Sequence, residues 1–166
     1  KVLRDARHQK FLASNANKVF IELGKELKEI LPGREEFEEN FKDLRYVNSP
    51  GGRMKTKYIL GKIDRYFNPT DEQKIDFDKT NAEHILPQNP IKWNLEKADV
   101  RNYVNSLGNI TLLDSKLNSK AGNKTPQEKI VFLGESQLRI NEDLLRNYDI
   151  LNWGEDSIEN RQKSLC

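Results

Sequence analysis

The chain has 166 residues, of which 36% are hydrophobic and 33% are charged, so it is long enough to bury a core and is polar outside it. No apolar run approaches the ~20 residues that a membrane span needs, and the first residues do not resemble a signal peptide. The net charge is only +2, which taken whole argues neither for nor against binding to nucleic acid. The chain begins at Lys1 without methionine, so we expect a domain or fragment of a longer protein.

The single cysteine, Cys166, excludes an intrachain disulfide and favours a reducing compartment, with the cytoplasm as the default. A structural zinc site needs about four Cys or His ligands, and this chain offers only Cys166, His8 and His84. Any metal would therefore use oxygen ligands, which favours Mg²⁺, with Mn²⁺ able to substitute, over zinc. No glycine-rich phosphate loop is present, so no nucleotide cofactor is expected.

Charge is distributed unevenly along the chain. Residues 33–43 are acidic, whereas residues 53–65 carry five basic side chains against Asp64 alone. Such segregation permits a local phosphate-binding face, although a solvated charged surface is the simpler interpretation of charge alone.

Apolar residues recur at helical spacing over residues 3–31, 35–44 and 53–67, with Pro32-Gly33 ending the first run. These runs predict a helical N-terminal unit, residues 1–67, that packs on the remainder, residues 68–166.

The second part of the chain begins with a different pattern. Residues 79–86 and 108–113 read as two antiparallel strands, separated by a long polar loop over residues 88–105. A helix is expected from about residue 115 to Ala121, closed by Gly122. Thr125-Pro126-Gln127-Glu128 is a capping box that opens another helix. Further short helices are expected over residues 141–147 and 155–165. The predicted fold class is mainly α with a small β-hairpin.

His84 is the residue on which a chemical interpretation depends. His8 lies among charged residues of the first helix, where a solvated side chain is expected, but His84 follows Glu83 at the end of a predicted strand and precedes a proline. Phosphodiester hydrolysis needs a base of near-neutral pKa and a cation held by oxygen ligands. Glu83 supplies one oxygen, Asn118 or Asn123 could supply another, and Asn109 could fix the imidazole ring. A structural histidine is the alternative.

Three segments carry a family resemblance: residues 83–88 (EHILPQ), 107–113 (LGNITLL), and 117–119 with 122–123 (LNS and GN). They resemble the HNH-like C-terminal nuclease domain of GmrSD-type (type IV) restriction endonucleases. Weaker similarity extends to residues 58–63 and to the tail residues Trp153, Ile158, Arg161 and Leu165. The order also resembles the HNH domain of RNA-guided CRISPR nucleases, in which two asparagines are nine positions apart, as Asn109 and Asn118 are here.

The resemblance implies a ββα-metal (His-Me finger) core over about residues 79–121. His84 would be the general base, Asn109 would orient its ring, and Glu83 and Asn118 would hold one Mg²⁺, with Asn123 as the alternative ligand. The nearby basic residues expected to contact phosphates are Lys116, Lys120, Lys124 and Lys129.

The resulting expectation is a metal-dependent endonuclease of a prokaryotic restriction or phage-defence system. It would act on double-stranded DNA together with an N-terminal recognition and NTPase domain of the same longer protein. A homo-oligomer is left open. The alternative is a catalytically inactive module of the same fold that binds nucleic acid or another protein.

Overall fold

A computed structural model describes the backbone of residues 2–67 and 76–166 and the side chains of residues 16–67 and 76–166. The chain forms two compact units, Lys1–Phe37 and Glu38–Cys166. The sequence instead predicted one helical unit over residues 1–67. The side chain of His8, and residues 68–75 where the second predicted part begins, lie outside the described residues.

The first unit is built on one long helix, α1 (Val2–Ile30), which matches the helix predicted over residues 3–31. The helix stops before Pro32 because proline has no amide hydrogen to donate and disfavours helical geometry in the residue before it. The next helix, α2 (Arg34–Lys42), runs into the second unit.

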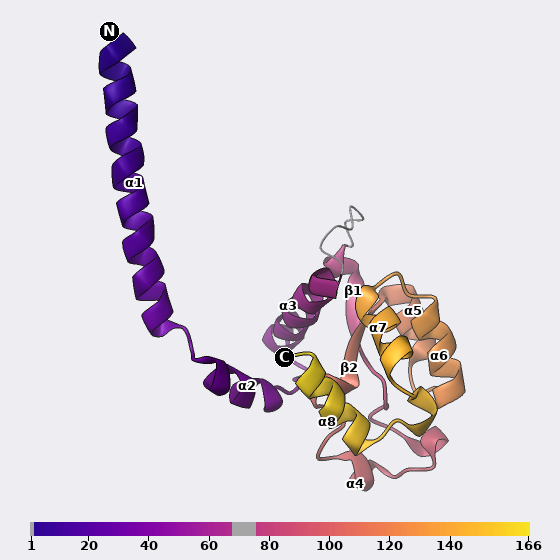
Figure 1. The fold of residues 1–166 in the computed structure, drawn as a ribbon. Helices are drawn as coiled ribbons and strands as arrows, with labels where there is room; N and C mark the ends of the chain where they lie inside the picture. Colours follow the sequence, from indigo (N-terminus) through magenta and orange to yellow (C-terminus); the bar gives the residue numbers. More distant parts are fainter. Residues whose placement is uncertain (1, 68–75) are drawn as a thin grey trace. The chain divides into compact units, whose positions relative to one another are not determined.

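The second unit, Glu38–Cys166, contains the hairpin and a set of shorter helices (Figure 1). In chain order its further elements are α3 (Pro50–Phe67), η1 (Phe77–Lys79), β1 (Thr80–His84), η2 (Ile91–Trp93), α4 (Lys97–Val100), η3 (Leu107–Asn109), β2 (Ile110–Asp114), α5 (Ser115–Ala121), α6 (Pro126–Gly134), α7 (Arg139–Asn147), η4 (Ile150–Asn152) and α8 (Glu155–Ser164). The described part is thus mainly helical with one two-stranded sheet, as the sequence predicted. Within it, no helix combines the length and the apolarity needed to cross a membrane.

The two strands pair antiparallel, with Thr80 opposite Asp114 and His84 opposite Ile110. The predicted antiparallel pair and the helix that follows it are confirmed, with the strands at Thr80–His84 and Ile110–Asp114 where the sequence predicted residues 79–86 and 108–113. Helix α5 begins immediately after β2 because the Asp114 carboxylate accepts hydrogen bonds from the amides of Lys116 (2.9 Å) and Leu117 (3.1 Å). The predicted capping box between Thr125 and Glu128 is also present at the start of α6.

Hydrophobic clusters cover both faces of the hairpin. Ile110 and Leu112 of β2 pack with Leu60 of α3 in one cluster, whereas Leu113 packs with Leu117 of α5 in the other. Figure 1 shows α3 on one side of the strands and α5 and α6 on the other. Because α3 buries Leu60 against the sheet, it belongs with the hairpin, which explains why the boundary between units precedes it.

Helix α8 anchors the turn that leads into β2. Arg161, which is fully buried, donates from Nη1 to the carbonyl oxygens of Gly108 (2.7 Å) and Ile110 (2.9 Å). Gln162 accepts from the Gly108 amide at 3.0 Å. Burial lowers the pKa of Arg161 to about 10, so the guanidinium stays protonated at neutral pH. This contact fixes the position of Asn109, which follows directly.

Gly108 cannot be replaced without moving α8. A Cβ atom there would lie 2.1 Å from the backbone oxygen of Ile158. We expect Gly108→Ala to lower the free energy of unfolding by roughly 1–3 kcal/mol, as overpacking typically does. The matched control is Gly134→Ala, where the added Cβ would meet its nearest neighbour, Leu145, at 3.8 Å. Urea denaturation of both variants measures the difference, and equal midpoints would contradict the close packing.

Candidate active site at the end of the hairpin

The His84 side chain stands at the last position of β1, in a partly buried setting. Its Nε2 lies 3.0 Å from Oδ1 of Asn105, and its ring meets the ring of Tyr46 edge-on, with centroids 5.1 Å apart. Burial is the largest effect on the His84 pKa and lowers it; the Lys129 charge adds to this, and the Asn105 hydrogen bond opposes it. The ring is therefore neutral at neutral pH, which is the form that a general base requires.

The residue that bonds the His84 ring is Asn105, and not Asn109 as the sequence predicted. The Asn109 side chain is fully buried, and its amide oxygen and nitrogen both form hydrogen bonds with residues other than His84. Its Oδ1 accepts from the Leu86 amide and from the Trp153 indole, and its Nδ2 donates to the carbonyls of Leu86 and Val104. Asn109 thus holds the loop that follows His84, and the expected ring contact is corrected to Asn105.

Glu83, the residue before His84, forms a buried ion pair. Its carboxylate contacts the ammonium of Lys129 on α6, and the same Lys129 Nζ donates to the His84 carbonyl oxygen at 2.7 Å. Only 7% of Glu83 and 1% of Lys129 are exposed. Burial raises the pKa of Glu83 and lowers the pKa of Lys129, while their mutual attraction opposes both shifts.

The four lysines expected to contact phosphates fall into two groups. Lys116 and Lys120 on α5 are exposed, and Lys124 is partly exposed and bonds Glu128 at 3.1 Å. Lys129 is buried on Glu83, so a phosphate at the surface cannot reach its ammonium. The expectation of a phosphate contact is therefore corrected for Lys129, because its role is to neutralise a buried carboxylate.

Asn118, the first of the two candidate amide ligands, has a side-chain oxygen whose hydrogen-bonding capacity the described residues leave unused. It lies on α5, which packs against both β1 and β2, and its Oδ1 is buried without a hydrogen-bond partner among the described residues. Buried polar atoms are nearly always paired, so an unpaired acceptor suggests a ligand that completes it. Asn123, the alternative candidate, lies beyond the end of α5 and is exposed. Among the described residues no three His, Cys, Asp or Glu side chains cluster to hold a metal, so an ion here would depend on an amide oxygen.

Of the residues near His84, sequence reasoning missed Asn105 and gave Lys129 a different role. Asn105 stands in the polar loop four positions before Asn109, and no local pattern marks it as the ring partner. Lys129 follows Gln127 and Glu128 in the polar first turn of α6, and nothing in this local pattern marks its charge as buried.

The described part thus defines a mainly α protein in which an antiparallel hairpin and the helix after it carry a histidine, a buried carboxylate and an unpaired amide oxygen. The model of the C-terminal domain of GmrSD restriction endonucleases matches residues 31–166, and the chain belongs to this family. Neither the curated proteins nor the solved structures gave a match. Family membership indicates a nuclease-related function in a restriction system.

Proposed function

We propose that the chain is a metal-dependent DNA endonuclease domain of the HNH (His-Me finger) type, with β1, β2 and α5 as its ββα-metal core. The observation that supports this most directly is the unpaired, buried Oδ1 of Asn118 on the helix that packs against β1, the strand of Glu83 and His84. Leaving a buried acceptor unpaired costs about 1–3 kcal/mol, which a bound cation or water that pairs this oxygen would recover.

His84 acts as the general base. Asn105 Oδ1 also accepts a hydrogen bond from Gln88 Nε2 at 2.9 Å, so this oxygen is an acceptor and Nε2 of His84 carries the ring proton. Nδ1 is then the nitrogen with a free lone pair, and it takes the proton from the attacking water. Asn105 sets both the tautomer and the orientation of the ring.

Glu83 and Asn118 are the residues that would hold a Mg²⁺ ion. Carboxylate and amide oxygens are the ligands that Mg²⁺ prefers, and an ion held by only two protein side chains keeps positions open for water and a phosphate. Bound there, the ion would polarise the scissile phosphate and stabilise the leaving oxygen. Lys129 already engages Oε1 of Glu83, which leaves Oε2 as the carboxylate oxygen for a cation.

The substrate is the phosphodiester backbone of double-stranded DNA. Lys116 and Lys120 are exposed on α5, and Lys124 follows that helix, so we assign these three lysines to the contacts with DNA phosphates. Recognition of the DNA and NTP hydrolysis are assigned to an N-terminal domain of a longer cytoplasmic protein. The role is phage defence by restriction.

A plasmid assay tests the proposal. Supercoiled plasmid is incubated with the full chain in Mg²⁺, Mn²⁺, Ca²⁺ or excess EDTA, and nicked and linear products are followed with time. We expect cleavage in Mg²⁺ and Mn²⁺, little in Ca²⁺ and none in EDTA, because Ca²⁺ is larger and less strict in geometry. Binding of DNA without cleavage under every condition would instead identify an inactive nucleic-acid-binding module, and full cleavage in EDTA would refute the metal chemistry.

Asn118→Ala separates a ligand role from a structural one. The substitution removes an unpaired buried acceptor and places a better helix former in α5, so the metal-free protein should unfold at an equal or higher temperature. Cleavage in Mg²⁺ should nevertheless fall by at least about 10-fold, with partial rescue at high Mn²⁺. The control is Ser119→Ala, which removes an exposed hydroxyl that donates to the Ser115 carbonyl at 2.8 Å. Lower stability with unchanged cleavage would contradict the ligand role.

A further inference from the structure

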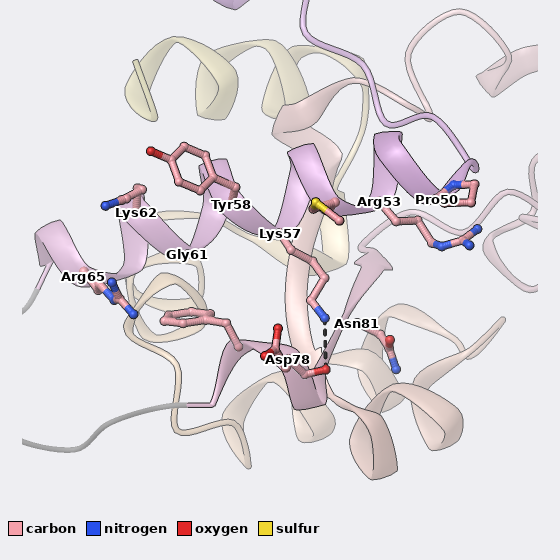
Figure 2. A pocket seen from close by; sticks show the side chains of 11 residues that line it. Pro50, Arg53, Lys57, Tyr58, Gly61, Lys62, Arg65, Asp78 and Asn81 are labelled. Atoms are coloured by element: carbon pink, nitrogen blue, oxygen red, sulfur yellow. Dashed lines mark hydrogen bonds between the residues drawn. The ribbon is translucent and has the colours of Figure 1, made fainter.

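The outer face of α3 forms one wall of a groove of about 640 Å³ (Figure 2). Its opposite wall is made by Phe77 and Asp78 of η1 and by Asn81 of β1. Gly61 lies in the middle of the helical wall, where a Cβ would come within 3.1 Å of the Phe77 ring. All of the lining residues belong to the second unit, so the groove is a feature of that unit alone.

Among the described residues, the groove is lined by one carboxylate, Asp78, and by four basic side chains: Arg53, Lys57, Lys62 and Arg65. Arg53 and Lys57 are four residues apart and Arg65 is eight residues after Lys57, so these three lie along one stripe of the helix. In the part of the chain that the structure describes, none of the four forms an ion pair. Within the described residues the groove thus carries a row of positive charges that no ion pair neutralises, with the carboxylates of Asp76 and Asp78 near Lys57.

Neutral groups hold these cations in place without cancelling their charge. Lys57 Nζ donates to the Asp78 carbonyl oxygen at 3.1 Å, drawn as a dashed line in Figure 2. Lys62 lies over the Tyr58 ring at 5.4 Å, and Arg65 lies over the Phe77 ring at 5.1 Å. Carbonyl and aromatic partners orient a cation while leaving it attractive to an anion.

The same groove exposes large apolar side chains. Tyr58 is 66% exposed and Met54 is 71% exposed, and both line the groove between the basic residues. Rows of cations interleaved with exposed aromatic rings are typical of surfaces that bind single-stranded nucleic acid, where cations contact phosphates and bases stack on the rings. A volume of about 640 Å³ suits a short stretch of one strand rather than a duplex.

A chain of contacts connects this groove to His84. Arg53 donates to Asn48 Oδ1 at 2.8 Å, and Asn48 lies 3.5 Å from the hydroxyl of Tyr46, whose ring packs edge-on against the His84 ring. The other wall includes Asn81, three residues before His84 on the same strand. The groove and His84 are thus connected through the segment before α3 and through β1.

We propose that this groove binds one unpaired strand of the nucleic-acid substrate, with phosphates on its basic residues and a base stacked on Tyr58. The inference rests on the proposed nuclease function for its purpose, since it names the surface that guides a strand to His84. Binding itself needs neither the metal nor the base, which allows the two ideas to be tested separately.

The test measures binding of a fluorescent oligothymidylate to the full chain by anisotropy, in EDTA and over a range of salt concentrations. The groove variant is Lys62→Gln with Arg65→Gln, and the matched control is Lys55→Gln with Arg101→Gln, which removes the same charges at exposed positions outside the groove. We expect the groove variant to bind roughly 10-fold more weakly, with a salt slope about 1.4 smaller, since each phosphate contact on a single strand contributes about 0.7. Tyr58→Ala should weaken binding roughly 5- to 150-fold through lost stacking.

Equal loss in the groove and control variants would overturn the inference. A polyglutamate peptide provides a second check. If it binds as tightly as the oligonucleotide and its binding is insensitive to Tyr58→Ala, the inference is overturned and the groove is a site for an acidic protein segment. Circular dichroism checks that each variant is folded, and Tyr58→Ala, which leaves the charge unchanged, gives a second independent variant. If oligonucleotide binding depends on the groove but plasmid is not cleaved, this inference is retained and the proposed function is refuted. If plasmid is cleaved but binding does not depend on the groove, the proposed function is retained and this inference is refuted.

Discussion

Replacing His84 with alanine is expected to lower plasmid cleavage by about 10²–10⁴, the effect typical of losing a general base. Within the described part of the chain, the side chain bonds Asn105 and its ring contacts that of Tyr46, so its removal takes little from the packing. The Lys129 contact reaches the backbone oxygen of His84 and survives the substitution. The variant should therefore remain folded while losing its chemistry.

The chain offers a matched control in its second histidine. His8→Ala removes the same side chain from α1, outside the unit that contains the hairpin, and cleavage should be unchanged. Anisotropy in EDTA should show that His84→Ala still binds DNA with nearly the wild-type affinity. Cleavage at the wild-type rate by His84→Ala would refute the assignment of the base, whatever the outcome for metal binding.

Local sequence patterns predicted the scaffold of the site well. The two strands, their pairing and the helix that begins after Asp114 follow from alternation, turn residues and capping, all of which act over a few positions. The helix over residues 3–31 and the capping box at Thr125 belong to the same class of signal. Such features are fixed by neighbouring residues, and tertiary packing did not override them here.

The partners of the catalytic candidates could not be predicted in this way. Glu83 and Lys129 are 46 positions apart, and their side chains are in contact because the fold brings α6 next to β1. Asn109 lies in the expected motif, yet its amide is used to hold Leu86 and Trp153, and Asn105 takes the place at the ring. Which of two nearby asparagines reaches a histidine depends on the path of a loop, and residue spacing alone does not fix that path.

The division of the chain shows a similar limit. The apolar stripe of α3 indicates that the helix buries one face, but it does not indicate the partner. In the structure Leu60 packs with Ile110 and Leu112, so α3 joins the hairpin and the first unit ends at Phe37. The stripe of α1, at the same helical spacing, lies in the other unit. The described apolar side chains of α1, from Val19 to Ile30, are exposed. Periodicity thus identifies an apolar face, and only the three-dimensional arrangement shows whether that face is buried and against which core.

Replacing Lys129 with methionine is expected to lower the free energy of unfolding by about 3–5 kcal/mol, the usual consequence of removing one partner of a buried ion pair. Methionine fills a similar volume, so the loss is electrostatic: Glu83, only 7% exposed, would keep a charge with no counterion. Urea denaturation measures the change. Lys120→Met, which alters an exposed residue of α5, is the control and should change stability by less than about 0.5 kcal/mol.

Two further measurements identify the cause of that loss. Burial already raises the pKa of Glu83, and without Lys129 it should rise further above the value in the unfolded chain. Protonation of Glu83 then favours the folded state of the variant. The loss of unfolding free energy in Lys129→Met should therefore be fully present above that raised pKa and should shrink as the pH falls through it. Adding Glu83→Met should recover much of the stability, because two apolar side chains can replace a buried pair at little cost. A deficit that is independent of pH and persists in the double variant would show that Lys129 stabilises α6 by packing, and that the buried charge of Glu83 needs no partner.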